Sequence, residues 1–95
     1  MKEGLRFLGI LNKAGKLLFG AAATRAVAKA SAMVLADDCA PNTKKAALPG
    51  FNGLLLTGVS KAELGSSLGY DELSVVLVMD HKASKALAEK WRKGE

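Results

Sequence analysis

Four basic side chains flank the short apolar runs in the first third of the chain, and phosphate binding is the chemistry open to them. They are Lys13, Lys16, Arg25 and Lys29. Residues 1–50 hold eight Lys and Arg against three acids, whereas residues 51–95 hold six of each, so the formal charge of +5 comes from the first half. A cationic half beside a neutral one is typical of a phosphate-binding surface, although a solvated face that binds nothing has the same charge pattern.

Side chains suited to catalysis or metal binding are few and isolated. Asp37 and Asp38 have no His or third carboxylate at ligand spacing, so we expect them to cap a helix. His81 follows Asp80 at the start of the last predicted helix, where a lone histidine is typically a surface residue. Cys39 has no second cysteine to pair with and is interpreted as an ordinary small residue. No nucleophile stands beside a base, so the sequence predicts neither enzymatic activity nor a cofactor.

The elements that must position these residues alternate between strands and helices. The predicted strands cover residues 17–19, 32–36, 54–57 and 74–79. The predicted helices cover residues 3–14, 21–30, 43–47, 61–68 and 82–93. Such an alternation predicts an α/β protein with a central sheet, at least partly parallel, that helices cover on both faces.

Particular residues mark where these elements begin and end. Gly15 suits the left-handed residue that ends the first helix. Gly20 permits the turn into the alanine-rich helix, in which Arg25 and Lys29 share a face. Residues 60–63 have the spacing of a capping box, in which the Ser and Glu side chains each accept a hydrogen bond from the other residue's backbone N–H.

Length and composition limit the remaining possibilities. A chain of 95 residues, 49% of them hydrophobic, is long enough for a single domain, residues 1–95, with one core. The lone cysteine and the lack of a signal peptide before the first helix favour a cytoplasmic protein. The longest apolar runs fall far short of the roughly 20 residues that span a bilayer, which excludes a membrane-spanning protein. We expect no membrane partner, although this length argument leaves a peripheral cationic contact open.

Four local patterns, in this order along the chain, resemble a known family. They are residues 13–17 with Gly20, residues 36–38 followed by 42–45, residues 60–65 with Leu68 and Gly69, and the strand that reaches Asp80. Together they cover most of the chain and resemble the kink-turn RNA-binding ribosomal protein superfamily called L-seven-Ae and L-thirty-e, most closely its bacterial YlxQ-type branch. The resemblance implies a three-layer α/β/α sandwich with a mixed, about four-stranded central sheet.

The same resemblance implies a function and a site. In the family, the second helix presents its N-terminus to kinked RNA, and the loop before the last strand covers unpaired bases. A ribosomal or ribosome-associated protein that binds structured RNA, of kink-turn or ribosomal type, is therefore expected. The RNA-binding residues implied are Lys13, Lys16, Gly20, Thr24, Arg25, Lys29, Asp38 and Tyr70. The four basic residues are expected near one another at Gly20, with Tyr70 stacking on a base and Asp38 orienting a base-contacting group.

One segment departs from the family pattern. Kink-turn binders carry an amide or basic residue, and then an acid or amide, after the equivalent of Gly20, whereas residues 21–23 of this chain are all alanine. Only Thr24 and Arg25 could substitute. The alternative function is a protein-interaction module that keeps the fold without the base-reading residues. A positive surface around Gly20 would favour RNA and an apolar patch there a protein partner, and the oligomeric state is left open.

Overall fold

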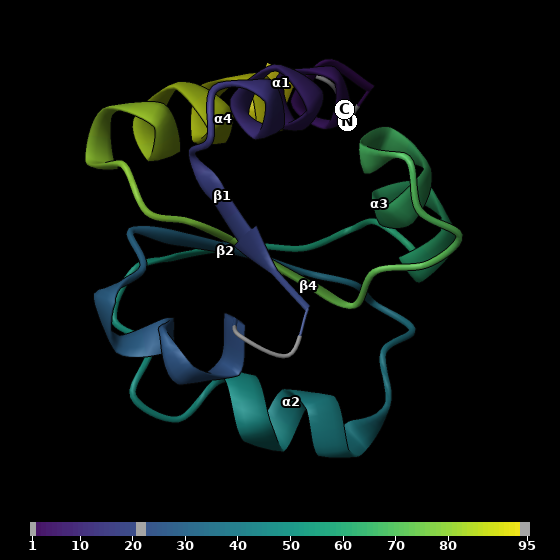
Figure 1. The fold of residues 1–95 in the computed structure, drawn as a ribbon, viewed down its shortest axis with the longest axis vertical. Helices are drawn as coiled ribbons and strands as arrows, with labels where there is room; N and C mark the ends of the chain where they lie inside the picture. Colours follow the sequence, from purple (N-terminus) through teal and green to yellow (C-terminus); the bar gives the residue numbers. More distant parts are fainter. Residues whose placement is uncertain (1, 21–22, 94–95) are drawn as a thin grey trace.

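A mixed four-stranded sheet forms the middle of three layers, with helices on both of its faces (Figure 1). The computed structural model describes residues 2–20 and 23–93 of the chain. The strands are β1 (Leu17–Phe19), β2 (Ala32–Leu35), β3 (Leu54–Leu56) and β4 (Val75–Val78). The helices are α1 (Lys2–Lys13), α2 (Pro41–Ala47), α3 (Lys61–Leu68) and α4 (His81–Lys93), with two 3₁₀ turns, η1 (Ala23–Arg25) and η2 (Val27–Lys29).

The direction of the strands brings distant segments together at two ends of the sheet. The strand order is β1-β4-β2-β3, with β2 parallel to β3 and β4 antiparallel to both β1 and β2. Therefore β1, β2 and β3 all point the same way. The side at which these three strands end, and β4 begins, is termed the carboxyl end of the sheet. The opposite side, where they begin and β4 ends, is termed the amino end.

The two central strands, β2 and β4, are buried on both faces, which explains their continuous apolar sequences. Side chains alternate between the two faces along each strand. Val34 and Val76 join the core beneath α1, α3 and α4, whereas Met33 and Leu77 join the core beneath η1, η2 and α2. The three layers are therefore held by two separate apolar cores, one on each face of the sheet (Figure 1).

Helix α4 is fixed on one side to α1 and on the other to the end of β3. A Cβ atom added to Gly4 of α1 would lie 2.5 Å from Cε3 of Trp91, so this contact leaves no room for a side chain. The Trp91 indole is buried, and its Nε1–H donates a hydrogen bond of 2.8 Å to the carbonyl of Thr57, directly after β3. One side chain thus joins α1, α4 and the sheet.

The elements follow the sequence predictions within one or two residues, except over residues 21–30. The alanine-rich sequence predicts one α-helix there, whereas the described part of this segment forms the two 3₁₀ turns η1 and η2. The prediction is wrong because so short a helix is marginal on its own, and burial of Ala23 and Val27 against the sheet decides the backbone. Consequently Arg25 and Lys29 do not share an α-helical face.

Candidate functional site

A small hollow opens at the carboxyl end of the sheet, beside the residue at which the chain leaves β1. Its volume is about 230 Å³. The residues that line it are Gly20, Thr43, Glu72, Leu73, Ser74 and Val75. Gly20 has a φ of +86°, which L side chains rarely adopt, and its carbonyl accepts a hydrogen bond of 3.1 Å from the Ala23 N–H. A turn that needs glycine therefore directs the chain from β1 into η1 at the rim of this carboxyl-end hollow.

The loop that leads into β4 carries Tyr70, and α3 holds this loop in place. Gly69 ends α3 in the left-handed conformation, and the Tyr70 N–H donates a hydrogen bond of 2.8 Å to the Gly65 carbonyl. A Cβ atom added to Gly65 would lie 2.7 Å from Cα of Glu72, so the loop lies directly against the helix. Gly65 of α3 and Gly69, the residue directly after the helix, thus position Tyr70.

The Tyr70 ring is held by Phe19 at the end of β1 and remains half exposed. The two ring centroids lie 5.3 Å apart with an interplanar angle of 75°, an edge-to-face arrangement. Tyr70 nevertheless retains 51% exposure. An aromatic ring that a neighbouring ring holds in place and that stays half exposed is a platform on which an unpaired base can stack. Phe19 is not among the RNA-binding residues that the family resemblance implies, although an aromatic residue directly before Gly20 is a usable signal.

Asp37 and Asp38 lie at the carboxyl end as well, and each carboxylate accepts a backbone hydrogen bond from beyond β3. Oδ1 of Asp37 accepts from the Gly58 N–H at 2.9 Å, and Oδ1 of Asp38 accepts from the Lys61 N–H at 2.7 Å. Asp38 therefore caps the first turn of α3, whereas α2 begins after Ala40 with no side-chain cap. The expectation that these acids cap a helix is confirmed for Asp38, although the helix that it caps begins 23 residues further along the chain, whereas the partner of Asp37, Gly58, precedes α3.

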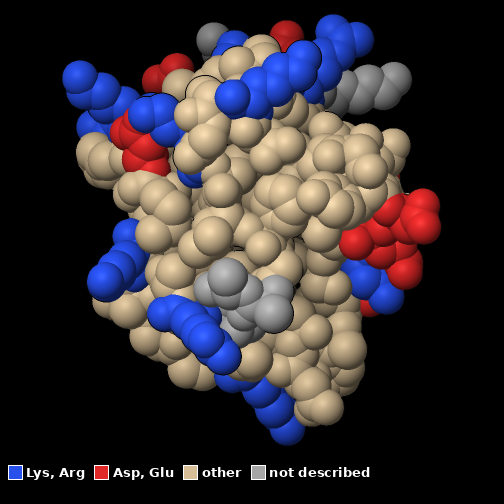
Figure 2. Space-filling model, viewed as in Figure 1, with Lys and Arg blue, Asp and Glu red and all other residues tan. Residues whose placement is uncertain are grey.

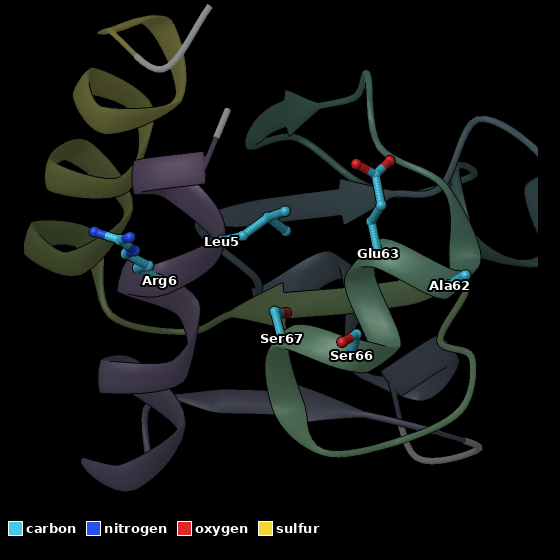
Figure 3. Close-up of a pocket in the computed structure, with 6 residues that line it drawn as sticks. All are labelled: Leu5, Arg6, Ala62, Glu63, Ser66 and Ser67. Atoms are coloured by element: carbon cyan, nitrogen blue, oxygen red, sulfur yellow. The ribbon is translucent and has the colours of Figure 1, made fainter.

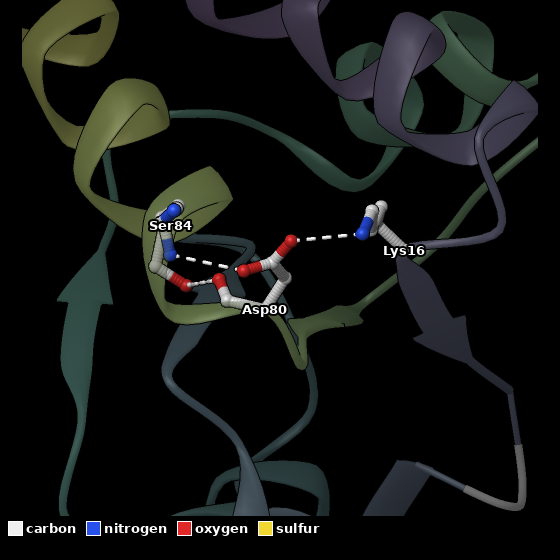
Figure 4. Close-up of polar contacts among 4 residues, drawn as sticks. Lys16, Asp80 and Ser84 are labelled. Carbon is white, nitrogen blue, oxygen red and sulfur yellow. Dashed lines mark hydrogen bonds and ion pairs between the residues drawn. The ribbon is translucent and has the colours of Figure 1, made fainter.

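Lys16 lies at the opposite, amino end of the sheet, in an ion pair with Asp80 (Figure 4). Its Nζ is 2.9 Å from Oδ2 of Asp80, and its carbonyl accepts a hydrogen bond of 3.3 Å from the Met79 N–H. Two hydrogen bonds to the carboxylate hold the pKa of Asp80 below its ordinary value. The larger effect comes from the Lys16 side chain, and the next from the Lys82 backbone N–H. The Asp80 carbonyl also accepts the N–H and Oγ–H of Ser84 in the first turn of α4, both at 2.9 Å.

The structure does not bring the four basic residues of the sequence prediction together at Gly20. Lys29 closely precedes β2 and therefore lies towards the amino end, as Lys16 does, whereas Arg25 lies in η1, near Gly20 in the chain. Lys13 ends α1 and lines a hollow between α1 and α3. The expectation of a single cluster is wrong, because the direction of β1 sends Lys16 and Gly20 to opposite ends of the sheet.

The alanine segment after Gly20 lies partly outside the residues that the structure describes. Ala22 and the side chain of Thr24 belong to that part. Ala23, by contrast, is fully buried in the core beneath η1 and α2. The expectation that Ala23 occupies an RNA-facing position is therefore wrong, because its methyl group packs in the interior.

The two ends of the sheet differ in charge. The loops at the carboxyl end carry the acids Asp37, Asp38, Asp71 and Glu72. Of these, Glu72 lies 3.8 Å from the Nζ of Lys61. Figure 2 shows a group of acidic side chains on the right of the face that it displays, with basic side chains spread over the upper and lower parts of that face. Because Lys16 and Lys29 lie towards the amino end and Arg25 lies in η1 near Gly20, the positive charge of the first half of the sequence is not gathered on one surface.

A hollow of about 570 Å³ lies between α1 and α3 (Figure 3). Leu5 points from α1 towards α3, whereas Arg6 points away from α3. The Glu63 carboxylate is engaged in the predicted capping box, which is confirmed: its Oε1 accepts the Ser60 N–H at 2.9 Å, and the Ser60 Oγ accepts the Glu63 N–H at 3.0 Å. Because its polar side chains do not converge, this hollow lacks the arrangement that orients a small ligand.

Residues 2–20 and 23–93 contain neither a metal-binding cluster nor a membrane-spanning helix. No three His, Cys, Asp or Glu side chains among these residues are placed to share a metal ion. No helix formed by them combines the length and the apolar character that crossing a membrane requires. Cys39 is buried and His81 is exposed, as the sequence predicts for an ordinary small residue and a surface histidine.

Two solved structures share this fold over nearly the whole chain. A protein of unknown function from Bacillus halodurans is similar with a TM-score of 0.84 at 26% sequence identity, over 97% of this chain and 99% of the other. The 15.5kD RNA binding protein of Giardia lamblia is similar with a TM-score of 0.73 at 22% identity, over 97% of this chain and 84% of the other. No family model and no curated protein matches the sequence. The predicted fold, a three-layer α/β/α sandwich with a mixed four-stranded central sheet, is confirmed.

Proposed function

We propose that this protein binds structured RNA at the carboxyl end of its sheet. The observation that carries the proposal is the Tyr70 ring, which Phe19 holds edge-on and which stays 51% exposed. Unpaired bases in RNA loops and bulges are accessible to such a ring, whereas the bases of a duplex are not. The likeness in fold to the RNA binding protein of Giardia lamblia supports the same function.

The proposal includes the finer features that the family resemblance implies. The RNA is of kink-turn or ribosomal type, and the protein acts in the cytoplasm as a ribosomal or ribosome-associated protein. Residues 1–95 form a single RNA-binding domain, and this domain is not an enzyme. The residues proposed to bind RNA are Lys13, Lys16, Gly20, Thr24, Arg25, Lys29, Asp38 and Tyr70. Gly20, Asp38 and Tyr70 belong to the carboxyl end, whereas Lys16 and Lys29 lie towards the amino end and would reach the same RNA from there.

Titration of two RNAs at several salt concentrations tests this function. One RNA contains a kink-turn internal loop, and the other is a plain duplex of the same length. We expect tighter binding of the kink-turn, because only that RNA offers unpaired bases. Its affinity should fall as salt rises, with a log–log slope of roughly −3 to −4 if about four phosphates are neutralised. Equal affinity for both RNAs would contradict recognition of unpaired bases, and no binding even at low salt would exclude RNA altogether.

A protein-interaction module is the second candidate, and one observation favours it. Leu54 and Leu55 of β3 are each 46% exposed. Within the described residues β3 is an edge strand that pairs with β2 alone, so its outer side is open to a strand of another protein. This apolar surface lies on β3 and not around Gly20, so the two functions are separable. A Leu55→Lys variant alters the apolar edge and leaves the Tyr70 platform unchanged.

A further inference from the structure

Four chain segments meet at the amino end of the sheet. The Ser31 N–H donates a hydrogen bond of 2.9 Å to the Val78 carbonyl, which brings the start of β2 to the end of β4. The carbonyl of Ser31 in turn accepts the Leu54 N–H at 3.0 Å, which adds the start of β3. The turn before β1 joins them through Lys16 and Met79. The charged residues of these four segments, 14–16, 29–31, 50–53 and 79–82, are Lys16, Lys29, Asp80 and Lys82.

This end of the sheet carries positive charge that no acid balances. Asp80 is the only acid in the four segments, and Lys16 already pairs with it at 2.9 Å. Lys29 and Lys82 are exposed, and no ion pair among the described residues includes them. Lys85 is also exposed and lies one turn after Lys82, on the same side of α4. Among the described residues none of these three lysines takes part in an ion pair, and around one neutralised pair they form a surface that attracts anions.

The surface beside these lysines is concave. A hollow of about 380 Å³ opens there. The residues that line this amino-end hollow are Ala30, Ser31, Asn52, Gly53, Leu54 and His81. Lys29 and Lys82 are the chain neighbours of two lining residues, Ala30 and His81, so the lysines flank it. Hydroxyl, amide and imidazole groups such as those of the lining residues can donate hydrogen bonds to phosphate oxygens.

We propose that the amino end of the sheet is a second RNA-binding surface, which holds the phosphate backbone of a duplex. The inference rests on the proposed function for its partner. Of the residues proposed there it uses Lys29 alone for its charge, and it adds Lys82 and Lys85. Contacts to phosphate position an RNA without reading its sequence. The two surfaces have different roles because their charges differ. The acids beside Tyr70 repel phosphate, whereas the amino end attracts it.

An anionic membrane is the other large polyanion, and this surface suits it less. Peripheral helices bind membranes by inserting an apolar face next to their basic side chains. The apolar face of α4 is not available for insertion, because Leu87 and Trp91 are buried against the sheet and α1. A duplex backbone needs only charge and hydrogen-bond donors, and the amino end offers both.

Duplex binding by two matched variants tests the proposal. The amino-end variant carries Lys29→Ala, Lys82→Ala and Lys85→Ala. The control variant carries Lys44→Ala, Lys45→Ala and Arg92→Ala, which removes the same charge from exposed positions elsewhere. The probe is a plain RNA duplex at several salt concentrations. We expect the amino-end variant to bind roughly tenfold more weakly and its salt slope to shrink by about 2 to 3, at about 0.9 for each lost phosphate contact. The control should keep the slope of the unaltered protein.

Other outcomes would overturn the proposal. Equal losses in both variants would mean that the attraction is diffuse, and preference for vesicles containing phosphatidylserine over the duplex would mean that the partner is a membrane. All six replaced side chains are exposed, so both variants should fold, and Lys82→Glu offers a second test with a loss in the same direction.

A Tyr70→Ala variant separates this surface from the proposed function. Loss of kink-turn preference with duplex binding retained supports both surfaces. If the Tyr70→Ala variant still prefers the kink-turn RNA to the duplex, Tyr70 does not recognise unpaired bases. The amino-end surface then stands or falls on the result for its own variants. A protein that binds the kink-turn RNA but never a plain duplex would overturn the amino-end surface alone, and a protein that binds neither RNA would overturn both.

Discussion

Recognition of unpaired bases depends at the residue scale on one ring, that of Tyr70. Replacing Tyr70 with Ala removes base stacking worth about 1–3 kcal/mol, so affinity for the kink-turn RNA should fall by roughly 5- to 150-fold. Tyr70→Phe should keep most of the affinity, because the ring and its edge-to-face contact with Phe19 remain. Titration by fluorescence anisotropy measures both. A loss in Tyr70→Phe as large as that in Tyr70→Ala would show that the hydroxyl, and not stacking, makes the contact.

The ion pair between Lys16 and Asp80 makes stability depend on pH in acid. The pKa of Asp80 lies below its ordinary value of 3.8 in the native protein, because the carboxylate accepts hydrogen bonds from Lys16 and from the Lys82 N–H. The unfolded chain therefore takes up the proton first as the pH falls, and the native state loses this stabilisation as the pH drops through the native pKa. At neutral pH the stabilisation is fully present.

Thermal melting of an Asp80→Asn variant from about pH 7 to about pH 2 checks this dependence. Asn keeps an oxygen that can accept the Lys82 N–H but removes the charge. We expect the unaltered protein to melt above the variant near neutral pH, and the gap to close in strong acid. Asp71→Asn, at an exposed acid for which the described residues show no ion pair, serves as the control and should show a smaller gap. A gap that stays constant with pH would contradict the role of the carboxylate charge.

At the scale of elements, two glycines inside helices affect the stability of the protein. Replacing them with alanine should change the free energy of unfolding in opposite directions. A Cβ atom at Gly65 of α3 would meet backbone atoms of Glu72 at 2.7 Å, whereas one at Gly9 of α1 would lie 3.5 Å from the Ser67 carbonyl oxygen, an ordinary contact. Gly65→Ala should therefore destabilise the protein by about 1–3 kcal/mol and displace the Tyr70 loop. Gly9→Ala should stabilise it by roughly 0.5–1 kcal/mol, since alanine favours a helix more than glycine does.

Denaturant unfolding of both glycine variants measures these opposite shifts, and RNA titration shows whether the loop has moved. We expect weaker kink-turn binding in Gly65→Ala at temperatures where the variant is folded, and unchanged binding in Gly9→Ala. An unaltered RNA affinity in folded Gly65→Ala would mean that α3 does not control the position of Tyr70.

Elements whose signals are local could be predicted from the sequence, and those decided by packing could not. The capping box of Ser60 and Glu63 and the end of α3 at Gly69 are properties of a few adjacent residues, and the structure has both. The alanine-rich segment has a strong helical propensity, yet burial of Ala23 and Val27 against the sheet overrides it. Asp38 belongs to the second group, because the helix that it caps lies far along the chain.

Topology decides the distribution of charge over the whole molecule. Counting along the chain assigns the positive excess to the first half, but the strand directions place Lys16 and Lys29 beside Lys82, a residue of the second half. The prediction of Gly20 and Tyr70 as RNA-binding residues rests on the family resemblance, and both lie at the carboxyl end. The contact between Tyr70 and Phe19, the residue before Gly20, depends on the packing of β1 against a distant loop, which no local pattern reveals.

Trp91 gives the molecule an optical reporter of its own folding. It is the only tryptophan in the chain, and its indole is enclosed by Gly4 of α1 and hydrogen-bonded to the Thr57 carbonyl. A buried indole emits at a shorter wavelength than one in water, so its emission changes when the helical layer separates from the sheet. Intrinsic fluorescence therefore distinguishes, without any attached label, a variant that has lost its fold from one that has lost only its affinity for RNA.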